Sequence, residues 1–509
     1  MGAILIFQRL SSGFAALLVS IFLFAFPLKG YSAIAGFKYG IFLLICGGYC
    51  AAVIIIRVQL ALTGIQPIGR KQIVGSIKSI PVAVKLLLLF LFFSVLSCVF
   101  SDYGGTFLGE FRREGALTVA VYVLSCCFLS KYFRPQKWML FLLGASTCLF
   151  CIIPLIQLTG ANPFALYPEG YSYYDAGVHY SGEYLGTIGN AGLCAGFISI
   201  VTGVLAMSLI KFDFSKKRLL AIPLFLAVFL TFEMAVDAGI AALAAGLLIM
   251  IPVAVTDRTS LARTFAVFAV VIAAFAVSRA VIFSDGRVAF AADRLTPLIA
   301  AGLAAALAAF VMKWRLIAKI PARGYRIGSF AVVLLAICLA VIYLWFYRGE
   351  SSGMIYEASE VLHGRWDDTF GSRRVYIWRS VLGGVRENLL IGTGPDTLGH
   401  WDIAPFTRYS EELGTTLTAR IDAAHNEYLQ ILACTGLLSL LCYLGALMYT
   451  AVKWFRTPDN SLSAVAGAGV LFYSVQAFFG ISMPITAPFF WAGLAVLVYS
   501  QNHIQHKHI

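Results

Sequence analysis

The sequence predicts an all-α polytopic membrane protein with about 14 (12–14) transmembrane helices and a large extracytoplasmic loop that contains short helices. Of its 509 residues, 60% are hydrophobic and 12% are charged, whereas a soluble domain has about 25% charged residues. Apolar runs of about 17–25 residues, long enough to cross roughly 30 Å of hydrocarbon, recur from end to end. Once these runs are set aside, no soluble domain of ordinary size remains.

Fourteen apolar segments are predicted to span the membrane. The run from 219 to 255 is too long for one helix and is interrupted by Glu233 and Asp237, so we divide it into two short helices joined by an acidic turn. The predicted spans are 13–28, 33–56, 82–100, 115–130, 138–158, 185–209, 219–232, 239–255, 261–283, 295–312, 328–346, 426–452, 463–480 and 485–500.

Positive charge sets the predicted orientation. Lys and Arg gather in the connections after spans two, four, six and ten, and more weakly after spans eight and twelve. Because basic connections stay on the cytoplasmic side, we expect both termini in the cytoplasm. The net charge of +13 then reflects orientation and not nucleic-acid binding. Two long segments lie outside: the acidic connection 159–184 and the 78-residue connection 348–425.

The chain is therefore expected to consist of spans one to eleven (1–347), the large extracytoplasmic loop (348–425), and spans twelve to fourteen with a cytoplasmic tail (426–509). All eleven Cys lie in apolar runs. Cys148 and Cys151 form a single CxxC inside a hydrophobic helix, without the second pair that a zinc site needs. His503, His506 and His508 belong to a short terminal segment that we interpret as solvated. We predict no metal site and no cofactor.

The large loop contains eight Arg and no Lys. A general basic surface would mix the two, whereas the planar guanidinium favours bidentate binding of phosphate or carboxylate. For most of these arginines the simpler interpretation is preferred, in which they pair with the loop's eleven Asp and Glu residues and fold it.

Arg374 is an exception. Ser372 is expected to cap a helix from 373 to 386. Its apolar face comprises Val375, Ile377, Trp378, Val381, Leu382 and Val385. Arg374 lies near the middle of that face, where a cation needs an anion that a ligand could supply. Snorkelling, or an internal ion pair with Glu233 or Asp237, is the structural alternative. Arg373 is a secondary candidate, and so is Arg379, although Arg379 points away from the apolar face.

His425 lies where the loop re-enters the membrane. Asp422 is expected to cap span twelve and to place His425 in its first turn. There the helix dipole disfavours an imidazolium, so the ring should stay neutral and able to accept a proton. A histidine at a helix start is often only structural, but the neighbouring arginine-rich loop favours a functional role here.

Several motifs occur in order along the second half of the chain: Arg374-x3-Trp378, then Asn388-Leu-Leu-Ile-Gly-Thr-Gly394, then Ala424-His-Asn-Glu-Tyr-Leu429 with Gly436. Together they resemble the O-antigen ligase and polymerase family of bacterial membrane enzymes. An upstream motif containing Asn190 (Gly186 to Gly192) is similar to another family motif. The family-like region covers about 185–445, and the residue-level resemblance is concentrated in 373–436.

The resemblance implies a metal-independent, inverting glycosyltransferase of the membrane-embedded GT-C kind. Its donor would be a glycan on undecaprenyl diphosphate. Its acceptor would be either a lipid-anchored core sugar, for a ligase, or another lipid-linked glycan, for a polymerase. Its remaining partners would be membrane lipids and polysaccharide-assembly proteins. By motif match, Arg374, helped by Arg373, would hold the diphosphate and His425 would activate the acceptor hydroxyl; Arg379, Asn190 and Asn426 are further candidate substrate contacts.

One family motif is absent. The family often has Ser-Arg-Gly or Ser-Arg-Ser between two mid-chain helices, where this chain has Ala235-Val-Asp237-Ala-Gly239. The phosphate-binding arginine expected there is missing, and Arg279 or Arg294 would have to replace it.

A lipid-linked oligosaccharide flippase or another transporter is the main alternative, because fourteen spans and intramembrane charges also suit a transporter. Internal repeats are common in transporters, and none is seen between the halves of this chain. A flippase also has no need of a 78-residue outer loop. A structural scaffold for polysaccharide assembly is a third possibility without a positive signal.

Overall fold

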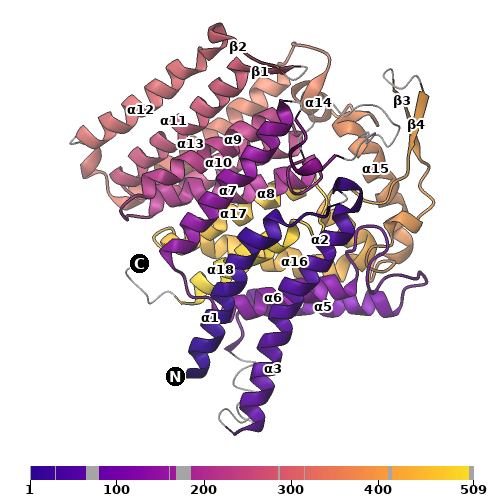
Figure 1. Ribbon diagram of the computed structural model, residues 1–509. Coiled ribbons are helices and arrows are strands. Elements are labelled where there is room, and N and C mark those ends of the chain that lie inside the picture. Colours follow the sequence, from indigo (N-terminus) through magenta and orange to yellow (C-terminus); the bar gives the residue numbers. More distant parts are fainter. Residues whose placement is uncertain are drawn as a thin grey trace.

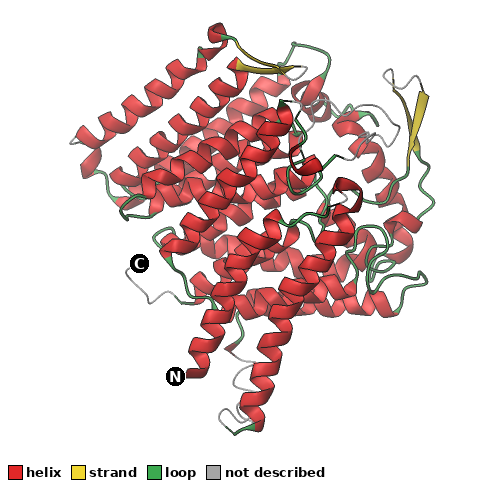
Figure 2. Ribbon diagram, viewed as in Figure 1, coloured by secondary structure: helices red, strands yellow, loops and turns green. Residues whose placement is uncertain are grey.

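The computed structural model describes residues 2–28, 30–64, 79–159, 161–167, 185–284, 287–314, 316–410 and 415–503. Within these ranges the chain is a bundle of helices with two short β-hairpins at its edge (Figure 2). Most of the acidic connection 159–184, part of the basic connection after span two, and His506 and His508 lie outside the described residues. The prediction of an all-α polytopic membrane protein is confirmed.

The helices follow one another along the chain as Figure 1 labels them. Their bounds are α1 (Gly2–Leu17), α2 (Ile34–Phe42), α3 (Gly48–Leu62), α5 (Val82–Val99), α6 (Ala116–Tyr132), α7 (Lys137–Leu158), α8 (Ala191–Lys211), α9 (Ala221–Glu233), α10 (Asp237–Ala254), α11 (Arg258–Ala280), α12 (Pro297–Lys313), α13 (Ala322–Trp345), α14 (Gly353–Leu362), α15 (Phe370–Val385), α16 (Glu427–Arg456), α17 (Ser461–Ala477) and α18 (Ala487–Asn502). A π-helical turn extends α1 to Phe22, and another joins α2 to α3.

Each of the fourteen predicted spans is helical over most of its length. Ten helices among the described residues are long and apolar enough to cross a membrane, and α6 and α17 are shorter apolar helices. The division of 219–255 is confirmed, because α9 ends at Glu233 and α10 begins at Asp237. Several predicted ends are wrong; α17, for example, stops at Ala477 and not at 480. Span six begins at Ala191 and not at 185, and α11 stops at Ala280, where an unpredicted strand follows.

The unpredicted strands form two antiparallel hairpins. One joins β1 (Val281–Ser284) to β2 (Arg287–Phe290), between α11 and α12. The other joins β3 (Phe406–Ser410) to β4 (Thr415–Ala419), inside the large loop. The short β3–β4 segments are rich in threonine and aromatic residues, which suit a strand better than a helix.

The centre and the rim of the bundle differ strongly in burial. Helix α8 packs against α17 at the centre, and 89% of the residues in its most apolar 18-residue stretch are buried. At the rim, only 6% of the corresponding stretch of α13 and 17% of that of α12 are buried. Figure 1 shows α11, α12 and α13 together on one side of the molecule, away from α5 and α6. Helices so exposed and so apolar are suited to contact with lipid.

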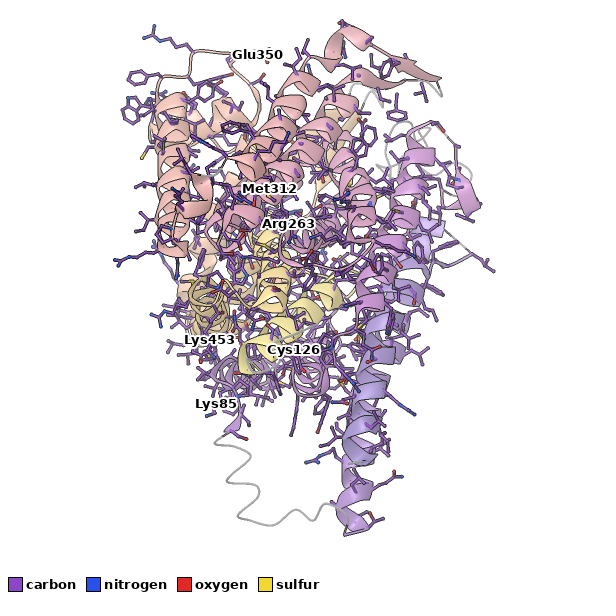
Figure 3. The ribbon with its side chains drawn as sticks, turned by 90° about the vertical axis from the view of Figure 1, so that its left-hand side faces the viewer. Lys85, Cys126, Arg263, Met312, Glu350 and Lys453 are labelled. Atoms are coloured by element: carbon purple, nitrogen blue, oxygen red, sulfur yellow. The ribbon has the colours of Figure 1, made fainter. Side chains whose placement is uncertain are left out.

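Contacts between connections agree with the predicted orientation. In the pairs below, each residue contacts one that is predicted to lie on the same side of the membrane. Three pairs join connections predicted to be extracytoplasmic: Ser101 with Thr393 (2.5 Å), Arg374 with Phe479 (3.1 Å), and Tyr31 with Gly186 (2.5 Å). Two pairs join segments at predicted cytoplasmic connections: Arg263 with Asp213 (3.1 Å) and Arg326 with Phe455 (2.7 Å). In Figure 3, Glu350 of the large loop and Lys85 of α5 lie at opposite ends of the molecule.

The large loop has a small apolar core of its own. Ile377, Val381 and Val385 of α15 are buried together with Leu398 and Ile421. Leu429, Ala433 and Cys434 of α16 complete this cluster, so the loop is packed onto the membrane bundle. Leu382 was predicted to share the apolar face of α15, and this is wrong, since 52% of it is exposed.

A break in α16 attaches the Asn388–Gly394 motif to the bundle. Gly436 has a φ of +84°, which interrupts the helix and frees carbonyl groups. The amide of Thr393 donates to Ala433 O (3.2 Å), and the amide of Gly394 donates to Cys434 O (2.8 Å). A Cβ at Gly436 would collide with the backbone of Leu390 and Ile391. These glycines of the motif therefore serve a close approach of two backbones.

Candidate functional site

Arg374 lies at the start of the regular part of α15. Residues Gly371, Ser372 and Arg373 have left-handed φ values, and Ser372 makes no capping hydrogen bond, so the predicted cap is wrong. This turn directs the guanidinium of Arg374 inward, where Nη1 donates to Gly371 O (2.8 Å) and Nε to Phe479 O (3.1 Å). Burial lowers the pKa of Arg374, while Asp237 and Glu357 oppose that shift.

No carboxylate forms an ion pair with Arg374 among the described residues. The predicted alternative of a direct pair with Glu233 or Asp237 is thus not realised, although Asp237 is near enough to act on the charge of Arg374. A buried guanidinium that donates only to two carbonyls retains free N–H groups, because it has five donors. It can therefore accept an anion without first breaking a salt bridge.

His425 lies immediately before α16 and not in its first turn. Asn426 is the N-cap, and its Oδ1 accepts a hydrogen bond from the amide of Leu429 (3.0 Å). The predicted cap, Asp422, is wrong because its carboxylate is bound to Arg112 instead. The backbone of His425 has a φ of +47°, a conformation that costs about 1–3 kcal/mol in a residue other than glycine and is typical of functional sites.

The imidazole of His425 is neutral at physiological pH. Burial lowers the pKa of His425 to about 4, and the positive charges of Arg374 and Arg112 contribute to the shift, while Asp422 opposes it. The predicted neutral ring thus arises from burial and two guanidinium groups, and not from the helix dipole. The segment before His425 is also fixed from the α15 side, because Trp378 Nε1 donates to Ala424 O (3.0 Å).

The connection between α5 and α6 supplies three groups that the sequence did not reveal as part of the site. Arg112 pairs with Asp422 (Nη2 to Oδ1, 2.5 Å). The amides of Phe111 and Arg112 both donate to Oδ2 of Asp396 in the large loop (2.9 and 2.8 Å). Glu114 accepts a hydrogen bond from Tyr122 (2.8 Å). This connection therefore forms one wall beside His425.

A cavity of about 70 Å³ lies between these walls. Its polar lining comes from Arg112, Glu114, Asp396, His425, Asn426, Glu427, Gln430, Thr435 and Ser482, so the predicted substrate contact Asn426 lies at this cavity. Its apolar lining includes the aromatic residues Phe90, Tyr122, Tyr443 and Trp491. Because Arg112 lines the cavity while 23% of its side chain is exposed, the cavity reaches the surface beside the Arg112–Asp422 pair. A concave site with an apolar floor and a few convergent polar groups is the usual form of a ligand site.

Glu427 fixes the floor of the cavity to the bundle. The hydroxyl of Tyr443 donates to its Oε1 (2.6 Å), and that of Tyr473 donates to its Oε2 (2.9 Å). A buried carboxyl group needs such partners, so α16 and α17 are joined directly beneath His425. The Glu427 of the motif is thus held in place by the two tyrosines.

Burial also raises the pKa of two carboxyl groups in the cavity wall, both outside the membrane-spanning helices. The pKa of Glu114 is raised to about 8 by burial, against the hydrogen bonds from Tyr122 and Ser482. Burial raises the pKa of Asp396, and the amides of Arg112, Phe111 and Glu114 oppose that shift. The wall therefore carries less negative charge at neutral pH than its carboxyl groups suggest.

The other predicted residues lie away from this cavity. Arg373 faces the β3–β4 hairpin, where Nη2 donates to Thr407 O (3.3 Å) and the guanidinium stacks over Phe406. Arg379 forms an exposed ion pair with Asp368 (2.8 Å). Asn190 caps α8 by accepting from Leu193 (3.0 Å). Arg279, at the end of α11, and Arg294 are exposed, and neither lines the cavity.

A bundle of apolar helices carries one large loop, and a partly buried arginine and a neutral histidine lie where the two meet. The candidate site of this membrane protein is therefore at the base of that loop. The family model described as O-antigen ligase matches residues 281–444. This match includes α15, the His425 segment and the part of α16 that contains the break at Gly436, and it confirms the resemblance to the O-antigen ligase and polymerase family. No curated protein matches the chain. The protein is therefore a membrane protein with a segment, residues 281–444, that is similar to the O-antigen ligase family.

Proposed function

We propose that the protein is an inverting glycosyltransferase that transfers a glycan from undecaprenyl diphosphate to an acceptor hydroxyl at the outer face of the bacterial cytoplasmic membrane. One observation carries the proposal. A partly buried arginine, with no ion-pair partner among the described residues, lowers the pKa of a neutral histidine that lines a cavity at the membrane end of the loop. Such a pair supplies an anion site and a proton acceptor, the two groups that this transfer needs.

Arg374 is proposed to hold the diphosphate of the donor. As the bond between the anomeric carbon and the phosphate oxygen breaks, the electron pair stays on the departing undecaprenyl diphosphate. A preorganised guanidinium stabilises that developing charge without rearrangement, so we propose that no metal ion is needed. The anchors of Arg374, at Gly371 and Phe479, keep its fork in one orientation.

His425 is proposed to take the proton of the acceptor hydroxyl as the oxygen attacks the anomeric carbon. Attack opposite the leaving group inverts the configuration at that carbon, and the proton passes from His425 to water afterwards. In the ligand-free protein, burial and the positive charges of Arg374 and Arg112 make His425 a weak base. A diphosphate on Arg374 would offset that positive charge and raise the pKa of His425, so the base becomes effective when the donor is bound.

The arrangement of the connections supports the proposed orientation. The α5–α6 connection, the large loop and the α17–α18 connection meet at the site through Arg112, Asp422, Arg374 and Phe479. All three are connections that the distribution of Lys and Arg places outside. Both termini would then be cytoplasmic.

Analysis of surface glycan in a strain that lacks the gene tests the function. Long glycan chains that are not attached to their anchor would indicate a lost ligase, and single repeat units would indicate a lost polymerase. Complementation with wild type should restore the product, and complementation with His425→Ala should not. Unchanged glycan in the deletion strain would contradict the proposal.

A further inference from the structure

We propose that the cavity beside His425 is an acceptor subsite, in which Asp396 and Glu114 bind hydroxyl groups on one edge of a neutral sugar ring. The inference rests on the proposed function, because it concerns the part of the acceptor that would lie next to the proton-accepting His425. Arg112, which joins the two walls, would orient the same sugar.

Asp396 provides the first observation. The residue is 4% exposed, and its Oδ2 is used by the amides of Phe111 and Arg112. Its other oxygen, Oδ1, is buried and forms no hydrogen bond of good geometry within the described residues, although the amide of Glu114 is also close to the carboxylate. A buried acceptor without a partner costs about 1–3 kcal/mol, and a ligand hydroxyl that donates to Oδ1 would remove that cost.

Arg112 provides the second observation. Its Nη2 binds Asp422, but its Nε is buried and has no hydrogen-bond partner among the described residues. Asp396 Oδ1 and Arg112 Nε are thus an unsatisfied acceptor and an unsatisfied donor on residues that line the same cavity. A hydroxyl group both donates and accepts hydrogen bonds, so neighbouring hydroxyls of one sugar match this pair.

The size and charge of the cavity limit the ligand. A volume of about 70 Å³ holds roughly five water molecules, which is the space for one edge of a sugar ring and not for an oligosaccharide. The aromatic floor of Phe90, Tyr443 and Trp491 suits the C–H face of such a ring. The one guanidinium among the lining residues, that of Arg112, is already paired with Asp422, so the carboxylate of a uronic acid would leave water without a free cation in this lining to pair with. We therefore infer a neutral sugar.

Binding of simple sugars to the full chain in detergent tests the subsite without requiring transfer. The probes are the methyl glycosides of glucose, galactose and mannose, with methyl glucuronide as the acidic counterpart, measured by saturation-transfer NMR. Wild type should bind at least one neutral glycoside better than the glucuronide. Asp396→Asn and Glu114→Gln should each weaken that binding up to about tenfold, the effect of one lost hydrogen bond. Asp368→Asn, at the exposed pair with Arg379, is the matched control and should bind as wild type does.

Asparagine tolerates the left-handed backbone of Asp396 (φ +61°), and Glu114→Gln decides the matter if Asp396→Asn does not fold. The subsite would be overturned if wild type bound no neutral glycoside, if both variants bound it as tightly as wild type does, or if wild type preferred the glucuronide. Failure of the proposed function has a different signature, because wild type would then bind the sugar but transfer no glycan. Where transfer occurs, both variants should raise the KM for the acceptor up to about tenfold and leave binding of the lipid-linked donor unchanged.

Discussion

His425 should make the folded protein less stable in mild acid. Its pKa is about 4 in the folded chain and about 6.5 in an unfolded chain. Between these values the unfolded chain binds a proton that the folded chain does not, so the free energy of unfolding falls as the pH drops from about 7 to 4. At pH 5 the loss due to His425 is about 2 kcal/mol.

Thermal unfolding of the detergent-purified protein measures this effect. Between pH 7.5 and pH 5, wild type should lose about 2 kcal/mol more than His425→Gln, which corresponds to a difference of about 2 °C in Tm for a chain of this length. Glu114 changes the stability in the opposite direction, because its raised pKa stabilises the folded state as the pH falls. Since Glu114 is present in both proteins, its contribution cancels in the difference between them. An equal loss in the two proteins would refute the buried, neutral placement of His425.

Three further predictions follow from particular contacts. Arg374→Lys should slow glycan transfer about tenfold or more, because an ammonium group cannot replace the oriented fork. Arg379→Lys, at an exposed pair, should stay within about twofold of wild type; transfer rates in membranes check both, and equal rates would contradict the role of Arg374. Gly436→Ala should reduce the yield of folded protein in size-exclusion chromatography, since its Cβ collides with Leu390; Gly445→Ala is the control, with Leu86 at 3.5 Å. Transfer should be unaffected by EDTA, and a loss restored by Mg²⁺ would contradict the metal-independent proposal.

Hydropathy predicted the helices well because a membrane span requires a long apolar run, whatever its neighbours are. The turn at Glu233 and Asp237 was found for the same reason, since two acids interrupt an otherwise apolar segment. The hairpins were missed because strands of four or five residues carry too little periodicity to be distinguished from loop.

The two predicted helix caps failed for a tertiary reason. Ser372 and Asp422 are both suitable cap residues, but Asp422 is bound by Arg112, which lies 310 residues earlier. Asn426, four residues after Asp422, caps α16 instead. Local sequence does not rank two suitable residues so close together when a distant partner binds one of them.

Arg374 and His425 could be found because each is an unusual residue in an apolar or re-entrant setting. Arg112, Glu114 and Asp396 could not be assigned to the site, because the fold alone brings the α5–α6 connection against the large loop. One signal was present in the sequence: the charged run Arg112-Arg113-Glu114 directly precedes a predicted span on its outer side. Charged residues at the outer end of a span are candidate site residues, but the sequence does not show which residues they contact.

Transfer by the purified protein in proteoliposomes tests the central claim most directly. The donor is a glycan on undecaprenyl diphosphate, and wild type should form the glycosylated acceptor while releasing undecaprenyl diphosphate. His425→Ala should remain folded and bind the donor, yet form no product. Product from His425→Ala at the wild-type rate, or movement of the intact donor across the bilayer by wild type without any transfer, would contradict the account.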